Sequence, residues 1–350
     1  MLLFNTIFSI AAIVLTVKAV APACGSYVVN SAGEDLSFSS YLFTDFRTIG
    51  NNHASATGTK SVVDKNAAAK GKQLTKRNNA AMASYFTNGL QRIWQVQKWE
   101  RPSSPVPMSN VAENVFIADD PSSDNTGDTM LSITTQRGQN GVQKSGEVAS
   151  AFRFKYGSIR FQARVTGDSG ACGGMFLYRS DTLESDFEFL TQEGPDYVHL
   201  TNQPGQKDGY PVPGAHSNIT LKTPYDQWNT YRLDWMPGMT RYYINGELAV
   251  EKTVNVSPEA MLWMMNMWSD GTVWPGVMAV GGSAKLDVRW LQIAFNKATE
   301  SFGSSAGSGV ACRLQNEMEG QGLVADSVKA AHGGSIAARA AALVGLGSSN

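Results

Sequence analysis

The 350-residue sequence is low in charge, and its positive and negative charges nearly cancel. Asp, Glu, Lys and Arg make up 17% of the chain, with 29 basic and 30 acidic residues. A balance so close to zero does not indicate a nucleic-acid partner, which a strongly basic chain would favour. The most basic stretch, residues 60–77, also holds several Ala, Asn and Gly residues, and we interpret it as a solvated surface loop.

Cysteine and histidine are also scarce. Three cysteines in a chain of this length exclude a disulfide scaffold, and their spacing does not match a zinc site. A bridge between Cys24 and Cys312 would tie the two ends together and leave Cys172 as a small buried apolar residue, but sequence alone does not supply the geometry. The four histidines lack metal-ligand spacing, and no phosphate-binding glycine loop is present. We therefore expect no redox or organic cofactor and no metal site.

The chain begins with an apolar run that predicts a signal peptide over residues 1–23. The run is short for a membrane-spanning helix, small residues follow it, and no second apolar run appears. A basic residue before the run is missing, so a retained membrane anchor stays open. We expect a secreted, extracellular monomer without stable membrane insertion, and cell-wall association stays open. In a secreted chain the sequons at Asn218 and Asn255 would be glycosylation sites.

Residues 24–298 are predicted to form one all-β domain. Short β-rich runs alternate there with Gly, Pro, Asn and Asp clusters, which is typical of an all-β sandwich. Asn245-Gly246 between two such runs predicts a type I′ hairpin turn. Residues 299–350 are rich in Gly, Ser and Ala, and we predict a mostly disordered tail. A GPI-anchor signal is the alternative, which Arg339 disfavours because it interrupts the apolar end.

The most informative stretch is ESDFEF at 184–189, which places Glu184, Asp186 and Glu188 at alternate positions. Alternate side chains of a strand point to opposite faces, so the acids share one face and the phenylalanines mark the other as core. Three like charges on one face repel, and Asp and Glu are poor strand formers. A solvated face is one interpretation. The other is paired-carboxylate catalysis, with an ionised nucleophile and an acid whose pKa like-charge coupling raises.

Retaining glycoside hydrolysis is the chemistry that such a pair can perform. It needs two carboxyl groups about 5–5.5 Å apart, whereas Cα atoms four residues apart on a flat strand are roughly 13 Å apart. The glutamates would therefore have to lean together on a concave sheet. Sugar rings suit aromatic faces with a few polar groups, and the sequence offers Phe176 with Tyr178, Asn266 with Trp268, and Trp274. Core packing would also explain Phe176.

With these residues in view, the chain resembles glycoside hydrolase family 16, whose signature Glu-x-Asp-x-Glu residues 184–188 match. Further stretches match in the same order: SGEVASAFRFKYGSIRFQARV at 145–165, WNTYRLDWMPGMTRYYINGE at 228–247 and MMNMW at 264–268. The resemblance implies a β-jelly-roll sandwich of two antiparallel sheets, of the concanavalin A-like lectin/glucanase type.

The resemblance also implies roles for single residues. Glu184 would be the nucleophile, Glu188 the general acid/base and Asp186 the residue that assists the nucleophile. Sugar contacts are implied for Glu147, Tyr178, Asn266 and Trp268. No extra residue separates Asp186 from Glu188, which resembles lichenases and wall transglycosylases more than laminarinase-like members. A structural Ca²⁺ is known in the family, and no site for one is assigned here.

Thr182, Leu183 and Ser185 depart from the family pattern, and the Val-Ala-Ser that follows Glu147 lacks an Arg seen in many relatives. We expect Ser185 to loosen the packing behind the site. The predicted function is that of a retaining endo-β-glycosidase, a glycoside hydrolase acting on a β-glucan or a related cell-wall polysaccharide. Transglycosylation on the same site is an alternative. A non-catalytic, lectin-like carbohydrate-binding protein is an alternative of another class.

Overall fold

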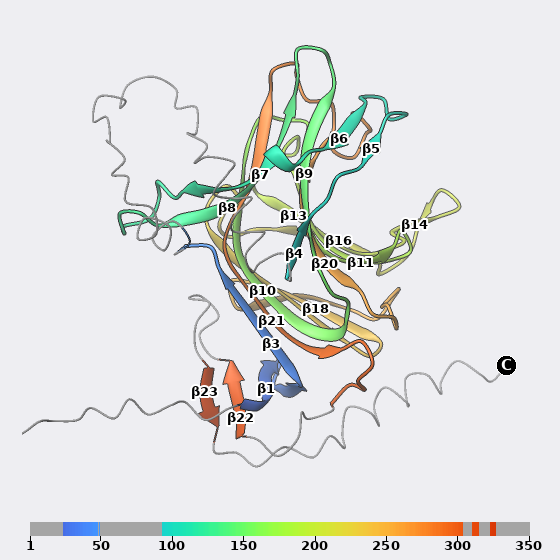
Figure 1. Ribbon diagram of the computed structural model, residues 1–350. Coiled ribbons are helices and arrows are strands. Elements are labelled where there is room, and N and C mark those ends of the chain that lie inside the picture. Colours follow the sequence, from blue (N-terminus) through green and yellow to red (C-terminus); the bar gives the residue numbers. More distant parts are fainter. Residues whose placement is uncertain (1–23, 48, 50–92, 304–309, 315–322, 327–350) are drawn as a thin grey trace, which may run out of the picture.

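The computed structural model confirms the all-β prediction. It describes residues 24–47, 49, 93–303, 310–314 and 323–326. Seventeen strands belong to one hydrogen-bonded sheet that folds over into two packed layers, and four more strands form a small sheet beside it (Figure 1). The predicted signal peptide and the basic stretch at 60–77 lie outside the described residues.

The first layer carries the candidate site and is called the site layer. Its neighbouring strands are all antiparallel. In hydrogen-bonded order they are β4 (Trp94–Val96), β9 (Gln143–Ser150), β20 (Leu262–Trp268), β11 (Cys172–Ser180), β12 (Leu183–Leu190), β13 (Tyr197–Asn202) and β16 (His216–Thr220).

The second layer, called the back layer, is also antiparallel and is built around the long strand β21. Strands β3 and β8 pair with successive halves of one edge of β21, and β10 pairs with its other edge. The strands are β7 (Val115–Asp119), β8 (Thr129–Arg137), β3 (Ser40–Asp45), β21 (Ser283–Lys297), β10 (Phe154–Gly167), β17 (Asn229–Met236), β18 (Met239–Ile244) and β19 (Glu247–Lys252).

The core lies between the two layers and is rich in aromatic rings. Phe187 of β12 contacts Phe161 of β10 and Tyr231 of β17 edge-on, with ring centroids 5.4 and 5.6 Å apart. Each fully buried aromatic side chain of this kind contributes roughly 2–3 kcal/mol of apolar burial. The site strand β12 is therefore anchored to the back layer through the side of the strand that carries no charge.

Short elements connect or border the layers. Asn245 and Gly246 join β18 to β19 with φ values of 49° and 82°, which confirms the predicted type I′ turn. The remaining short elements are β5 (Glu100–Arg101), β6 (Met108–Asn110), the 3₁₀ turn η2 (Ala112–Asn114), β14 (Gln206–Lys207) and β15 (Tyr210–Pro211). Within the described residues, no helix is long and apolar enough to cross a membrane.

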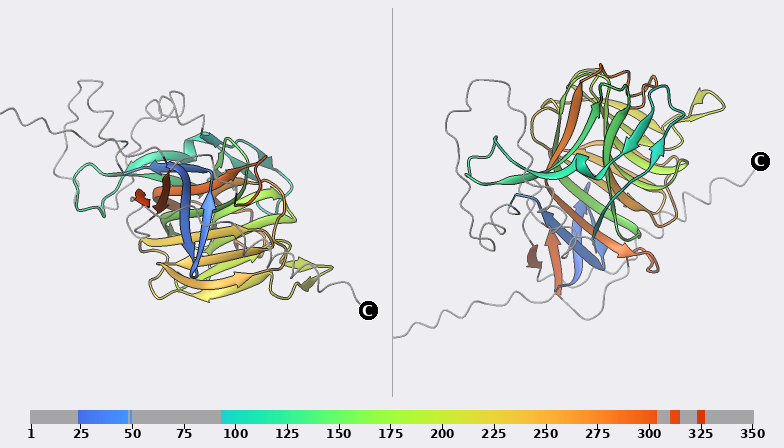
Figure 2. Two further views of the ribbon diagram at one scale, coloured as in Figure 1. Left: turned by 90° about the horizontal axis from the view of Figure 1, so that it is seen from below. Right: turned by 45° about the horizontal axis from the view of Figure 1, so that its top comes forward.

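A small sheet of strands from both ends of the chain covers part of the outer face of the back layer (Figure 2). It consists of β2 (Glu34–Phe38), β1 (Cys24–Ser31), β22 (Val310–Leu314) and β23 (Leu323–Asp326). Cys24 and Cys312 form the disulfide considered from the sequence, and Cys172 is a buried free thiol. The prediction of disorder beyond residue 299 is wrong for β22 and β23, because β22 pairs with β1 and is bonded to it covalently.

Candidate active site

Strand β12 presents the three predicted catalytic acids on one face. Its inward-facing residues, Ser185, Phe187 and Phe189, are at most 1% exposed. The acids point to the outer face, where Asp186 is 2% exposed and the two glutamates are half-buried. The alternation predicted for this strand is therefore confirmed, and the core contacts of β12 determine where its acids point.

The pairing register of the site layer aligns other predicted residues with the acids. Residues paired across neighbouring strands are roughly 5 Å apart and point to the same face. The row through Glu188 reads Asn218, His199, Glu188, Gly174, Asn266, Glu147. The row through Asp186 reads His216, Thr201, Asp186, Phe176, Met264, Ala149. Tyr178 lies opposite Glu184 on β11.

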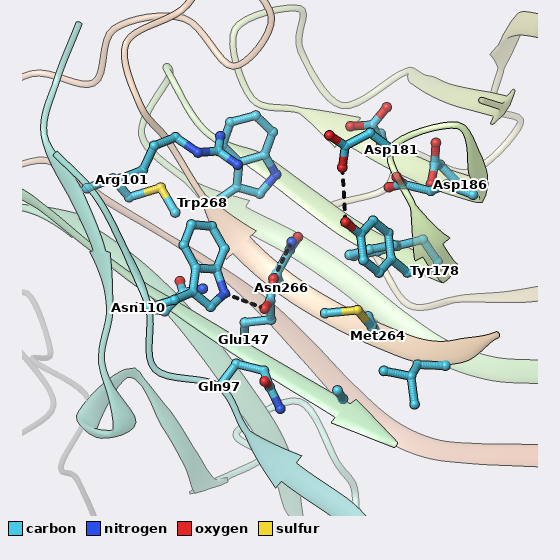
Figure 3. Close-up of a pocket in the computed structure, with 18 of the residues that line it drawn as sticks. Gln97, Arg101, Asn110, Glu147, Tyr178, Asp181, Asp186, Met264, Asn266 and Trp268 are labelled. Carbon is cyan, nitrogen blue, oxygen red and sulfur yellow. Dashed lines mark hydrogen bonds between the residues drawn. The ribbon is translucent and has the colours of Figure 1, made fainter. Parts of the chain in front are cut away.

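The outer face of the site layer is hollowed by a cavity of about 450 Å³ (Figure 3). Eight of the nine residues predicted from the sequence line it: Glu147, Phe176, Tyr178, Glu184, Asp186, Glu188, Asn266 and Trp268. They come from β9, β11, β12 and β20, which are far apart in the sequence and adjacent in the sheet. The fold therefore brings together residues that the sequence could connect only through the family resemblance.

Sequence reasoning missed part of the cavity wall. The missed aromatic, amide and charged residues are Gln97, Trp99, Arg101, Asn110, Arg153 and Asp181. Most of them come from the segment that follows β4, where the sequence pattern was hard to interpret. A weak signal was present, since Gln97 and Trp99 are two positions apart and share a face in an extended chain. Nothing local indicated that this segment would lie beside β9.

Glu147 is the centre of a hydrogen-bonded group on the wall of the cavity (Figure 3). Trp99 Nε1 donates to Glu147 Oε1 at 2.8 Å, and Asn266 Nδ2 donates to Oε2 at 3.1 Å. Burial raises the pKa of Glu147, and these two donors work against that rise. Arg101 lies over the ring of Trp99 with its guanidinium carbon 5.2 Å from the centroid. The group combines an aromatic face with fixed acceptors and donors, as a sugar-binding wall requires.

Burial is the main influence on the pKa values of the three acids. It raises the pKa of Glu184 to about 8, with the charge of Glu188 adding to the rise and an interaction with Asp186 opposing it. Burial also raises the pKa of Asp186 well above its usual range, and the charges of both glutamates add to this. Gln203 Nε2 donates to Asp186 Oδ2 at 3.0 Å and partly offsets it. The cavity thus raises the pKa of both Glu184 and Asp186 and favours their protonated forms.

The pKa of Glu188 is raised mainly by burial. Burial raises it, whereas hydrogen bonds from Trp274 Nε1 at 2.9 Å and Cys172 Sγ at 3.5 Å lower it, as does the charge of His199. Like-charge repulsion with Glu188 adds to the rise in the pKa of both Glu184 and Asp186. The carboxyl group of Glu188 thus combines burial, two hydrogen-bond donors and its acidic neighbours.

Trp274 is the one predicted site residue that lies outside the cavity lining. The sequence predicts that it contacts sugar. In the structure its N–H donates to Glu188, and its ring makes a T-shaped contact with His199, with centroids 4.9 Å apart. The loop after β20 brings it to Glu188, a contact between segments 86 positions apart that no local pattern could reveal.

Ser185 does not loosen the packing behind the acids, contrary to the expectation from the sequence. It is fully buried, and its hydroxyl donates to Asn202 Oδ1 at 2.9 Å. Tyr242 donates to the same oxygen at 2.8 Å, and Asn202 Nδ2 donates to Thr240 Oγ1 at 2.9 Å. Where the family usually has an aliphatic side chain, the hydroxyl of Ser185 thus joins a buried network in which the polar groups are hydrogen-bonded.

The two predicted glycosylation sites differ in accessibility. Asn218 is exposed on β16. Asn255 is partly buried, and its Nδ2 donates to the backbone oxygens of Pro204 at 2.9 Å and Asn202 at 3.4 Å. Glycosylation at either residue stays a prediction. No group of three or more His, Cys, Asp or Glu residues in the described part of the chain could hold a metal ion.

Comparison with known proteins agrees with this geometry. Residues 110–292 match the family model described as Glycosyl hydrolases family 16. The chain is 24% identical over 184 residues to a beta-glucanase of Paenibacillus polymyxa, covering 49% of this chain and 72% of that protein. It is 27% identical over 184 residues to the endo-1,3-1,4-beta-glycanase ExoK of Rhizobium meliloti strain 1021, covering 49% and 63%. A solved beta-glucanase of Bacillus licheniformis is 19% identical with a TM-score of 0.49, covering 60% of this chain and 95% of that one.

Proposed function

Because this chain belongs to glycosyl hydrolases family 16, we propose that it is a retaining endo-β-glycosidase acting on a β-glucan or a related cell-wall polysaccharide. The observation that carries the proposal is that one strand presents Glu184, Asp186 and Glu188 to a single cavity with aromatic and polar walls. The names of the relatives, a beta-glucanase and an endo-1,3-1,4-beta-glycanase, support a β-glucan as the substrate.

In the first half of the reaction, the ionised form of Glu184 bonds through a carboxylate oxygen to the anomeric carbon. Its pKa of about 8 makes this the minority form at neutral pH. The bond from that carbon to the leaving sugar breaks, and its electron pair goes to the glycosidic oxygen, which takes the proton of Glu188. Asp186 keeps its own proton and directs it toward Glu184. The opposite effects of these two residues on each other's pKa support this arrangement.

In the second half, the now ionised Glu188 removes a proton from a water molecule. The water oxygen bonds to the anomeric carbon, and the bond to Glu184 breaks and restores its carboxylate. Two displacements at one carbon retain its configuration. Burial of Glu188 supports this cycle, because it raises the pKa of this carboxyl group and so favours the protonated form that donates to the leaving sugar.

Transglycosylation is the second candidate function. The site layer continues past Glu188 over β13 and β16, where His199, His216 and the exposed Asn218 share the face of the acids. A sugar bound on that side would be placed to replace water in the second half of the reaction. Hydrolysis and transfer share the same covalent intermediate, so the acceptor decides between them.

The experiment is a substrate panel of β-1,3-, β-1,4- and mixed-linkage glucans and chitin–glucan, with products sized and their anomeric configuration determined. Glu184→Gln and Glu188→Gln should each lose at least about 10³-fold in kcat, while Glu247→Gln, an exposed glutamate of the back layer, should match the wild type. Full activity of Glu184→Gln on every cleaved glucan would show that the nucleophile is misassigned. Binding of a glucan by a wild type that cleaves nothing would identify a lectin-like protein instead.

We also propose that the protein is secreted after removal of residues 1–23. The Cys24–Cys312 disulfide supports this, because such bonds persist in oxidising compartments. Mass spectrometry of the protein from the culture medium would determine its first residue and any glycan on Asn218 or Asn255. Recovery of the protein only from the cytosol, with both cysteines reduced, would contradict the proposal.

A further inference from the structure

The loop between β20 and β21 makes one directed contact with the catalytic strand. Trp274 Nε1 donates to Glu188 Oε1 at 2.9 Å. An indole N–H can only donate, so it bonds most strongly to a carboxylate and gains less from a protonated carboxyl group. The contact therefore favours one of the two states through which Glu188 passes during the proposed reaction.

Two consecutive residues that follow β12 hold this tryptophan in place. Gln192 Nε2 donates to the backbone oxygen of Trp274 at 2.7 Å and to that of Val273 at 3.0 Å. The side chain of Gln192 lies close to the backbone of the loop, because a Cβ at Gly276 would lie 2.6 Å from Gln192 Oε1. Gly276 also has a φ of +80°, which favours glycine. The backbone of the loop is thus fastened to the end of the strand that carries the acids.

The ring of Trp274 is held by the second of these residues, through a histidine. Glu193 Oε2 lies 2.7 Å from His199 Nε2, and the rings of His199 and Trp274 meet in a T-shaped contact at a centroid distance of 4.9 Å. His199 is 5% exposed and stacks on His216, 5.2 Å away. The indole is therefore supported on its backbone and on its ring, which fixes the direction of its N–H toward Glu188.

We propose that Trp274 is a positioning residue that stabilises Glu188 as the general base of the second half-reaction. The inference rests on the proposed glycosidase function and deepens it. In the first half Glu188 must hold a proton, and the indole contact is then weak. Once that proton has gone to the leaving sugar, the N–H of Trp274 stabilises the new carboxylate and orients the oxygen that activates water.

Other titratable groups lie around Glu188 and are not removed when Trp274 is changed. They are Glu184 and Asp186 on its own strand, Cys172 on β11, His199 on β13, His216 on β16, and Glu193 after β12. A suitable substitution removes the indole N–H and leaves these groups in the chain. Trp274→Phe removes the donor and keeps a smaller aromatic ring that can pack against His199.

The test is the pH profile of Trp274→Phe beside that of the wild type. Loss of a donor to the carboxylate raises the pKa of Glu188, so the alkaline limb of kcat/KM should move up by about one pH unit, given about 1.4 kcal/mol for a hydrogen bond to a charged group. With an activated aryl glycoside, which leaves without acid assistance, kcat should fall about tenfold because the base step limits the rate. Val273→Ser is the matched control, since Val273 is 94% exposed in the same loop.

A second variant, Gln192→Leu, releases the loop without touching the indole and should move the alkaline limb in the same direction by a smaller amount. An alkaline limb that stays at the wild-type position in Trp274→Phe overturns the proposal, whether or not the melting temperature falls. That result leaves the glycosidase function standing if Glu184→Gln and Glu188→Gln are inactive. A wild type that cleaves no glycoside contradicts the proposed function itself.

Discussion

Gly173 and Gly174 are neighbours in β11 that face opposite sides of the site layer. A Cβ on Gly174 would lie 2.6 Å from Asn266 Oδ1, in the row that contains Glu188. A Cβ on Gly173 would lie 2.9 Å from Val165 Cγ2, in the core. One glycine therefore keeps the cavity open beside the catalytic acid, and the other lets the two layers approach.

This pair of glycines allows a matched test that separates effects on catalysis from effects on stability. Gly174→Ala should lower kcat/KM by about tenfold or more, because its methyl group displaces Asn266 and occupies space beside Glu188. Gly173→Ala should lower the melting temperature by several degrees and leave kcat/KM of the folded enzyme nearly unchanged, since overpacking costs roughly 1–3 kcal/mol. Kinetics and thermal unfolding of both variants check this. Equal effects of the two on kcat/KM would contradict the assignment of Gly174 to the cavity.

Glu184 should make the stability of the enzyme depend on pH. Its pKa is about 8 in the folded chain, against 4.5 for an ordinary glutamate, so the unfolded state loses this proton first. Stability is then full below about pH 4.5 and decreases as pH rises toward 8. Glu184→Gln removes this penalty, so its melting temperature should exceed that of the wild type by about 2 °C or more at pH 8. The two should melt together at pH 4, and a difference that is largest at pH 4 would have the wrong sign.

Trp99 should affect substrate binding through Glu147. Trp99→Phe keeps an aromatic face in the cavity but removes the donor at 2.8 Å, which raises the pKa of Glu147 further and frees its carboxyl group to turn. We expect KM for a glucan to rise about tenfold with a smaller change in kcat. Trp228→Phe is the control. It also removes one indole N–H donor, which bonds to Ser122 Oγ at 2.8 Å on the back-layer side of the molecule. An unchanged KM in Trp99→Phe would remove Glu147 from the binding wall.

The hydroxyl of Ser185 should contribute to the stability of the folded protein. Ser185→Ala removes one of the donors to Asn202 Oδ1 and leaves those of Tyr242 and Thr240. The expected loss is about 1 kcal/mol, or a melting temperature lower by about 2–4 °C. The exposed Ser103→Ala should melt like the wild type. A more stable Ser185→Ala variant would indicate that the buried hydroxyl is a defect in the packing.

Several features could be predicted from the sequence because they depend on neighbours in the chain. The alternation of acids and phenylalanines in β12 requires only the two-residue period of a strand, and the turn at Asn245 and Gly246 requires only residues that tolerate positive φ. The wall formed by Trp99 could not be found in this way, because its partner Glu147 is 48 positions away.

The sequence by itself determined the strand pattern, the face on which Glu184, Asp186 and Glu188 lie, and the family in which that pattern occurs. These follow from local geometry and the order of motifs. Only the tertiary structure decided the pKa values of the acids, since these depend on burial and on donors from remote segments, such as the N–H of Trp274. It also decided that β22 is ordered, because a strand needs a partner, and the partner β1 lies at the other end of the chain.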